Sequence, residues 1–140
     1  MLYRLFLIAT LFLFCNVDAQ IPPCNYTSNT QQLKEIKPSK EYDNILNMPL
    51  CSDSLSSSFI IWIKKEVKAH KHLKHSENIY VIEGAGRMKL GKDTFDIAAG
   101  DYIFIPQNTI HEVVVKSNIP LKVLSVQSPY FDGKDRVSEY

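Results

Sequence analysis

Seven short runs of β-branched and aromatic residues dominate the chain from Phe59 onward. Glycine, proline or asparagine lies between most of the runs, and turn residues at this spacing are typical of β-strands with short connections. The runs that we predict to be strands are Phe59–Ile63, Asn78–Ile82, Arg87–Leu90, Thr94–Ile97, Tyr102–Ile105, Glu112–Val115 and Leu121–Val126. No stretch of this region keeps a helical period for ten residues. The pattern therefore predicts an all-β sandwich or closed barrel.

The N-terminal part of the chain has a different pattern. Residues 1–19 combine an early basic residue, Arg4, with an apolar run over residues 5–14, which is typical of a cleaved signal peptide. That run is too short for a transmembrane helix, which needs about 20 apolar residues. We therefore expect cleavage near Ala19 and export, to a periplasm or out of the cell. Residues 20–58 are polar and contain prolines, and we expect an N-terminal arm with one or two short strands laid over the domain.

Export would leave two cysteines, Cys24 and Cys51, in the mature chain. Cysteines of exported proteins are commonly paired, so we expect a disulfide, with two buried thiols as the alternative. Closing a loop of this length contributes roughly 3 kcal/mol of stability when chain entropy alone is considered.

Composition limits the kinds of partner that the chain can have. It has 140 residues, with 16 Lys and Arg against 15 Asp and Glu, and a formal net charge of +1. A balanced charge without a basic cluster argues against nucleic-acid binding. Hydrophobic residues make up 45% of the chain, which argues against disorder. We expect one domain whose partner is a small molecule, with no nucleic acid and no membrane span.

The candidate chemistry lies in the histidines. His70 and His72 are two positions apart, so on a strand they share one face and can reach one metal ion. Glu77 follows beyond an expected bend, and His111 opens a separate strand that could bring it opposite the others. His75 lies beside this group as a spare. Three imidazoles and one carboxylate suit one divalent ion of Fe, Mn, Ni, Cu or Zn.

The alternative interpretation of residues 68–75 is a solvated polar loop, because three lysines lie among these histidines. The wider spacing favours a metal site, and it resembles the cupin family. The first cupin motif is His-x-His, four residues, Glu, six residues and Gly, and the matching positions are His70, His72, Glu77 and Gly84. The second motif is Gly, five residues, Pro, x, Gly, two residues and His, and the matching positions are Gly100, Pro106 and His111.

Three positions depart from the family pattern, and none of them is a ligand position. Lys64 and Asn108 stand where glycine is usual, and Val115 stands where asparagine is common. Asparagine adopts a positive φ more readily than other non-glycine residues, so the turn at Asn108 can be kept. The resemblance covers residues 59–127.

This resemblance implies a single jelly-roll β-barrel over residues 59–127, followed by a C-terminal tail over residues 128–140. It also implies that the metal ligands are His70, His72, Glu77 and His111. The function implied is that of a metal-dependent enzyme acting on a small organic molecule by oxidation, isomerisation or lyase chemistry. The alternative is a non-catalytic, metal-containing binder of a sugar or small organic acid.

Strand alternation predicts what surrounds the metal. If Glu77 points inward, so do Ile79 and Val81, and Val113 and Val115 share the face of His111. This predicts a largely apolar cavity suited to a small organic molecule.

Polar candidates for acid–base chemistry are fewer. Tyr80 and Tyr102 are weak catalytic candidates, beside Lys68 and Gln127, and the alternative for each is a packing or rim position. Gly84–Gly86 is expected to form a hairpin turn. We also predict a homodimer, because the arm could cover a sheet edge of its own barrel or of a partner's.

Overall fold

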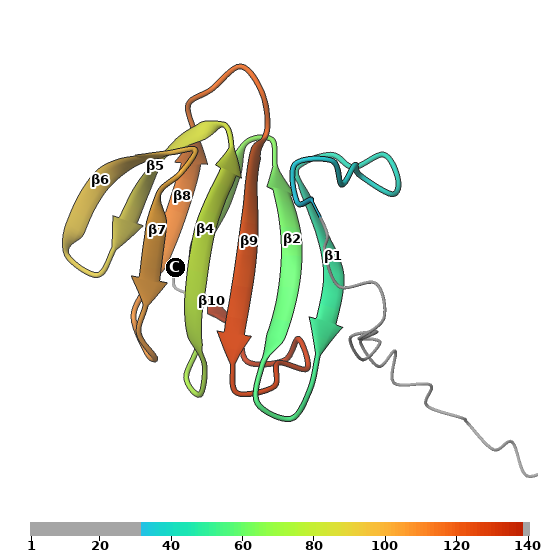
Figure 1. The fold of residues 1–140 in the computed structure, drawn as a ribbon. Helices are drawn as coiled ribbons and strands as arrows, with labels where there is room; N and C mark the ends of the chain where they lie inside the picture. Colours follow the sequence, from blue (N-terminus) through green and yellow to red (C-terminus); the bar gives the residue numbers. More distant parts are fainter. Residues whose placement is uncertain (1–31, 139–140) are drawn as a thin grey trace, which may run out of the picture.

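The computed structural model describes residues 32–138 of the chain (Figure 1). These residues form ten β-strands, and none of them lies in a helix. The described part therefore contains no helix that could cross a membrane. The signal peptide over residues 1–19 and Cys24 lie outside the described residues, so export and the Cys24–Cys51 disulfide stay predictions.

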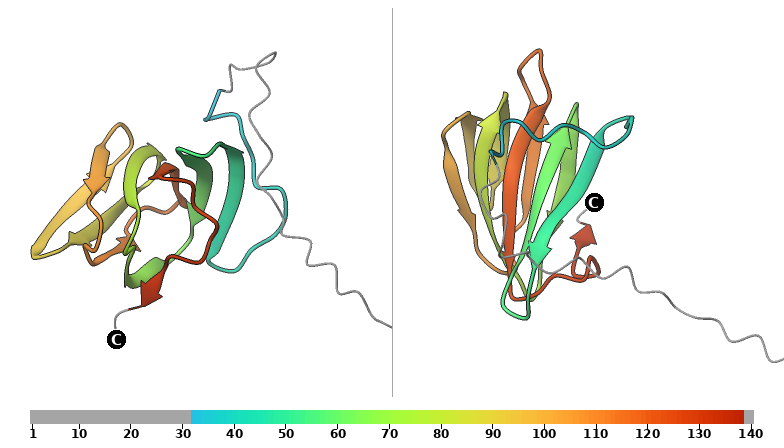
Figure 2. Two further views of the ribbon diagram at one scale, coloured as in Figure 1. Left: turned by 90° about the horizontal axis from the view of Figure 1, so that it is seen from below. Right: turned by 45° about the vertical axis from the view of Figure 1, so that its right-hand side comes forward.

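The strands form two antiparallel sheets of five strands each, stacked face to face (Figures 1 and 2). The first sheet has the order β1 (Ile45–Ser52), β2 (Ser57–Ile63), β9 (Leu121–Ser128), β4 (Ser76–Glu83) and β7 (Tyr102–Ile105). The second has the order β10 (Val137–Ser138), β3 (Glu66–Lys71), β8 (His111–Val115), β5 (Ala85–Leu90) and β6 (Asp93–Ala98). This arrangement confirms the all-β jelly-roll prediction, although the two sheets are not hydrogen-bonded into a closed cylinder.

Each predicted run corresponds to one strand, and β7 has the predicted bounds. Strand β3 was not among the predicted runs, because Glu66–Lys71 holds only one β-branched residue. The core lies between the sheets, where alternate residues of β4, β8 and β9 are buried, among them Val81, Val113 and Val123.

The strand immediately before β2 belongs to the same sheet as β2. Strand β1 pairs with β2 along its length, so this segment adds an edge strand to the chain's own sheet. Residues 32–42 then cross the outer face of that sheet (Figure 2), where Leu33 and Ile36 pack near Trp62. Lys122 lies under this segment with only 2% of its surface exposed. Its Nζ donates hydrogen bonds to the backbone oxygens of Lys34 and Ile36 at 3.0 and 2.8 Å.

Two turn predictions have different outcomes. Asn108 has a φ of 56°, so the asparagine does keep the left-handed turn. The predicted hairpin at Gly84–Gly86 is wrong, because β4 and β5 lie in different sheets. Gly84 turns the chain with a φ of 81°, but Gly86 is not in the turn. It lies inside β5, where a Cβ atom would come within 3.0 Å of Val113 and 3.1 Å of the backbone oxygen of Val114. Gly86 therefore permits a close approach of neighbouring strands rather than a bend.

Candidate metal centre

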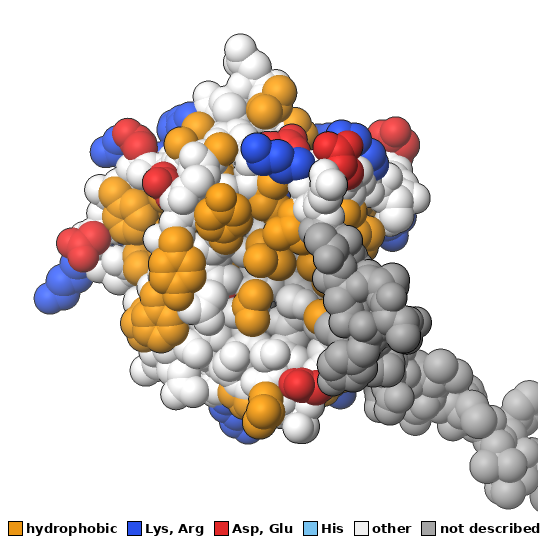
Figure 3. Space-filling view, in the orientation of Figure 1, with side chains coloured by type: hydrophobic (Ala, Val, Ile, Leu, Met, Phe, Trp, Pro, Cys, Tyr) orange, Lys and Arg blue, Asp and Glu red, His pale blue; other side chains and the backbone are white. Residues whose placement is uncertain are grey.

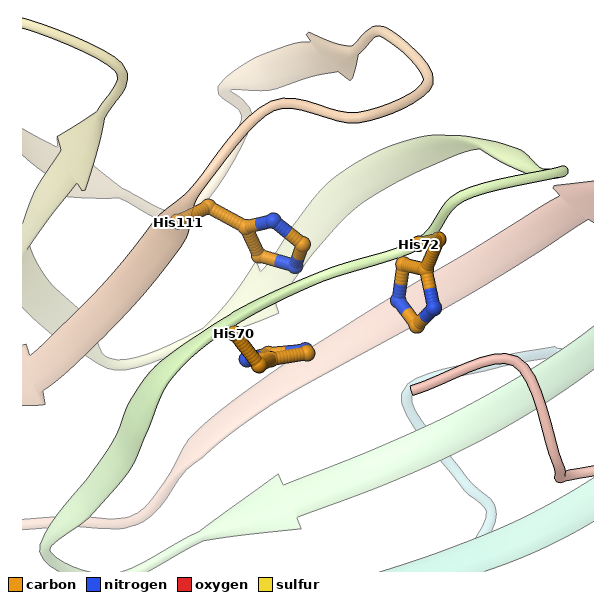
Figure 4. A group of neighbouring side chains, drawn as sticks. All are labelled: His70, His72 and His111. Carbon is orange, nitrogen blue, oxygen red and sulfur yellow. The ribbon is translucent and has the colours of Figure 1, made fainter. Parts of the chain in front are cut away.

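Three histidines meet inside the molecule, at the end of the sheets where β3 finishes and β8 begins (Figure 4). His70 lies opposite His111 in the β3–β8 pairing, and His72 follows two residues later on the same side of the chain. All three side chains are buried. Their candidate ligand nitrogens lie within 4.8 Å of one another, a spacing that permits all three to hold one metal ion.

An irregularity in β3 gives the histidines this direction. Val67 pairs with Val113, but the next pair is His70 with His111, so β3 holds one residue more than β8 over the same length. Without this β-bulge, regular alternation from Val67 would turn Ala69 inward and His70 outward. The extra residue reverses the alternation, as bulges near functional sites commonly do.

Each ring is held by its second nitrogen. The Nδ1 atoms of His70 and His111 lie 2.9 and 3.0 Å from the backbone oxygens of Lys68 and Thr109, and Nδ1 of His72 contacts the backbone oxygen of Asp135. A carbonyl oxygen can only accept, so each Nδ1 carries the proton. In the neutral rings Nε2 then holds a free lone pair, which is the arrangement of metal-binding histidines.

Glu77 reaches the cluster from β4 in the opposite sheet. Its Oε2 lies 3.5 Å from Nε2 of His72 and 3.5 Å from Nε2 of His111. Ligands that surround one ion at about 2.1 Å are separated by roughly 3.0 to 3.4 Å, close to these distances. The other carboxylate oxygen accepts a hydrogen bond from Oγ of Ser125 at 2.5 Å. Nε2 of His111 is buried without a hydrogen-bond partner among the described residues, so the donor set fits a metal ion.

The electrostatics of the metal-free site favour the metal-binding protonation states of His70 and Glu77, but they favour the protonated form of His72. Burial lowers the pKa of His70 to about 3, helped by its electrostatic interactions with His111 and Arg136, so His70 is neutral near pH 7. Burial alone would raise the pKa of Glu77, but interactions with His111, His72 and Ser125 outweigh it and keep Glu77 ionised. Burial likewise opposes the charged form of His72, yet Glu77 and the oxygen of Asp135 leave its pKa raised.

His75 does not join the cluster. Its Nδ1 lies 2.5 Å from Oδ2 of Asp135, and its Nε2 lies 2.9 Å from the backbone oxygen of Tyr130. Both ring nitrogens are therefore committed to residues of the C-terminal segment, and His75 has a supporting role.

Asp135 is a site residue that sequence reasoning missed. Its carboxylate accepts hydrogen bonds from the backbone amides of Leu73 and Lys74 at 3.0 and 2.8 Å, besides its contact with His75. Its backbone oxygen orients His72. Asp135 lies outside both cupin motifs, in a tail without strand periodicity, so no local signal pointed to it.

An apolar cavity of about 280 Å³ adjoins the histidines. Most of its wall is hydrophobic, including Ile61, Ile79, Met88, Val113, Val123 and Phe131, which confirms the expected apolar surroundings. Val81 and Val115, which were expected to face the cavity, do not line it. Val81 is part of the hydrophobic core, and Val115 packs against that core. Gln127 is a polar wall residue, and its buried Oε1 has no hydrogen-bond partner among the described residues.

The two tyrosine candidates lie elsewhere. Tyr80 and Tyr102 oppose each other on β4 and β7, on the outer face of the first sheet, and are 43% and 63% exposed. With Phe104 they belong to the hydrophobic surface that Figure 3 shows over these strands. Tyr102 donates its hydroxyl proton to Oδ1 of Asn78 at 2.5 Å. Neither tyrosine lines the cavity. Lys68 is exposed and lies outside the cavity as well. Of the four polar candidates, Gln127 is therefore the one that lines the cavity.

Known proteins resemble the chain at the level of this domain. Residues 59–127 match the cupin domain family. The uncharacterized protein MJ1618 of Methanocaldococcus jannaschii is 34% identical over 76 residues, which are 54% of this chain and 61% of that protein. The mannose-1-phosphate guanylyltransferase RfbM of Salmonella typhimurium is 32% identical over 69 residues, which are 49% of this chain and 14% of that enzyme. The chain thus spans less than two thirds of either relative.

The fold has solved counterparts. The structure of KdgF from Halomonas sp. superposes with a TM-score of 0.63 at 20% identity, covering 71% of this chain and 91% of that one. An identity this low speaks for the fold and not for an activity. Residues 59–127 match the cupin domain family, and the described part of the chain has the jelly-roll fold of a small cupin.

Proposed function

We propose that this protein is a metal-dependent enzyme that acts on a small organic molecule by oxidation, isomerisation or lyase chemistry. The observation that carries the proposal is the orientation of three buried histidines. Each donates Nδ1–H to a carbonyl and turns Nε2 toward the others, next to an apolar cavity of about 280 Å³.

Each group of residues at the site has its own role in this proposal. His70, His72, His111 and Glu77 would hold one ion of Fe, Mn, Ni, Cu or Zn, and Ser125 fixes the carboxylate of Glu77. Such an ion supplies Lewis acidity or a redox centre when bound. The apolar wall excludes water and accommodates the carbon skeleton of the molecule, which strengthens electrostatic interactions at the ligands.

A second candidate is a non-catalytic binder of a sugar or small organic acid. Among the described residues that line the cavity there is no tyrosine, lysine, cysteine or aspartate, and the one carboxylate besides Glu77 is Glu112, which alternates with His111 on β8. Gln127 can form hydrogen bonds but cannot act as an acid or base at ordinary pH. In this case the ion would organise the site and hold the ligand without chemistry.

Elemental analysis of the untagged protein tests the shared premise. We expect about one ion per chain after reloading in the wild type and in His75→Ala, and almost none in His111→Ala, because His111 offers Nε2 to the cluster and His75 does not. Equal metal in the wild type and His111→Ala would refute the site. Dioxygen uptake and product analysis with the Fe, Mn, Ni and Cu forms then separate enzyme from binder. Turnover identifies an enzyme, whereas thermal shifts without turnover identify a binder.

We also propose that the protein works after export and as a homodimer. The support for export is the signal-peptide pattern of residues 1–19, and cell fractionation tests it. The support for a dimer is the exposed aromatic face that contains Tyr80, Tyr102 and Phe104. A monomeric mass in light scattering at micromolar concentration would reject the dimer.

A further inference from the structure

Arg136 faces the same cavity as the histidines, although it comes from the C-terminal segment. This segment crosses one end of the two sheets before it forms β10 (Figure 2, left). In the β10–β3 pairing Val137 lies opposite Lys71 and Ser138 opposite His70, so continuing the register by one residue places Arg136 opposite His72. Opposed residues of an antiparallel pair share a face, and Arg136 accordingly lines the cavity.

The guanidinium of Arg136 lies beside the cavity without a direct partner in the described part of the chain. It makes no hydrogen bond or ion pair with any residue between 32 and 138. Burial lowers the pKa of Arg136, an effect that the charge of Glu77 partly offsets. Arg136 is an exposed residue that also lines the cavity, so its guanidinium is accessible to an anion that enters there.

Nearby carboxylates are committed elsewhere. Glu77 is held by Ser125 and faces two histidines. Asp135 is bonded to His75 and to two backbone amides. Glu112 also borders the cavity, but it follows His111 on β8, so its side chain alternates to the opposite face of the strand, where it lies opposite Lys89.

The charge balance favours an anionic ligand. Glu77 offsets only one of the two positive charges that a divalent ion would add, and Arg136 adds another, inside a largely apolar cavity. Arginine pairs with a planar carboxylate through two parallel hydrogen bonds, whereas a hydroxyl or amide group would leave its charge unbalanced.

We propose that the ligand of this cavity is a small organic acid whose carboxylate is held by Arg136. Its carbon skeleton lies along the apolar wall, toward the three histidines. This inference rests on the proposed function, because it takes the metal centre as the other polar end of the site.

Titration calorimetry of the zinc-loaded protein tests the proposal with three acids, pyruvate, lactate and benzoate, and their neutral amides. We expect at least one acid to bind about tenfold or more tightly than its amide, as a charge-assisted pair predicts. Arg136→Gln should abolish this preference, while Arg136→Lys should retain part of it. The matched control is Lys134→Gln, which removes an equal charge from a 77% exposed side chain of the same segment and should bind like the wild type.

Three results would overturn the inference: no acid of the panel binds, acids and amides bind alike, or Arg136→Gln keeps the preference. Zinc content is measured in each protein before titration. If the wild type takes up no zinc, the proposed metal function fails, and the same titrations on the metal-free protein decide the role of Arg136. A preference for acids that Arg136→Gln removes supports the inference there too, and its absence refutes it.

Discussion

Replacing Asp135 with alanine is the sharpest test of how the C-terminal segment supports the metal centre. Asp135 joins this segment to the loop that follows β3, through its side chain and through the backbone oxygen that orients His72. Alanine keeps the backbone oxygen but removes the carboxylate that holds it in place. The variant therefore leaves every proposed ligand intact and perturbs only their support.

The expected loss can be worked from the contacts. Alanine removes hydrogen bonds from the amides of Leu73 and Lys74 at 3.0 and 2.8 Å and the contact with His75 at 2.5 Å. A hydrogen bond to a charged group contributes about 1.5 to 3 kcal/mol, and partial exposure places these bonds near the lower value. Three contacts near the lower value sum to about 4.5 kcal/mol, which is enough to release the loop. Loss of such support commonly lowers metal affinity 10- to 100-fold, or about 1.4 to 2.7 kcal/mol.

Competition with a chromophoric chelator for zinc measures this affinity directly. The matched control is Asp132→Ala, which removes an exposed carboxylate that bonds only within its own segment, to Lys134. We expect that control to stay within about twofold of the wild type, as surface substitutions do. If Asp135→Ala binds zinc as tightly as the wild type while His111→Ala does not, the segment does not position His72 and the reasoning is wrong.

Two further predictions concern the metal-free protein. The pKa of His70 is lowered to about 3, mainly by burial, so between about pH 6.5 and 3 the unfolded chain binds a proton that the folded chain does not. Stability should therefore fall on acidification by up to about 1.4 kcal/mol per pH unit more than in His70→Gln, and parallel urea-denaturation profiles for the two proteins would contradict this. Gln127→Met removes a buried oxygen without a partner, so urea denaturation should show unchanged stability or a gain of up to about 1 kcal/mol. A clear loss would mean that the amide has a partner in solution.

Local patterns were sufficient to predict the sheet framework. Alternation from Glu77 predicted that Ile79 would face the cavity, and it does. The same alternation turns Tyr80 outward, so the sequence alone was sufficient to exclude Tyr80 as a catalytic residue in the cavity. The left-handed turn at Asn108 followed from the conformational freedom of asparagine.

The parts that could not be predicted depend on register and on distant contacts. The bulge between Val67 and His70 decides which face of the strand the histidines take. The residues in between are Lys68 and Ala69, and neither is a glycine or another residue typical of a bulge. The partnership of His72 with Asp135 joins residues 63 positions apart. Such pairings arise from the packing of the whole chain and leave no local periodicity.

The long separation between His72 and Asp135 affects when the centre can first form during synthesis. A nascent chain that has emerged as far as β9 already contains all four proposed ligands, but not the segment that fixes His72. An ion bound at that stage meets all four proposed ligands, but His72 is not yet oriented by the backbone oxygen of Asp135. If the protein holds a metal as we propose, we expect the ion supply of the compartment where the C-terminal segment docks to act together with the ligands in setting its identity.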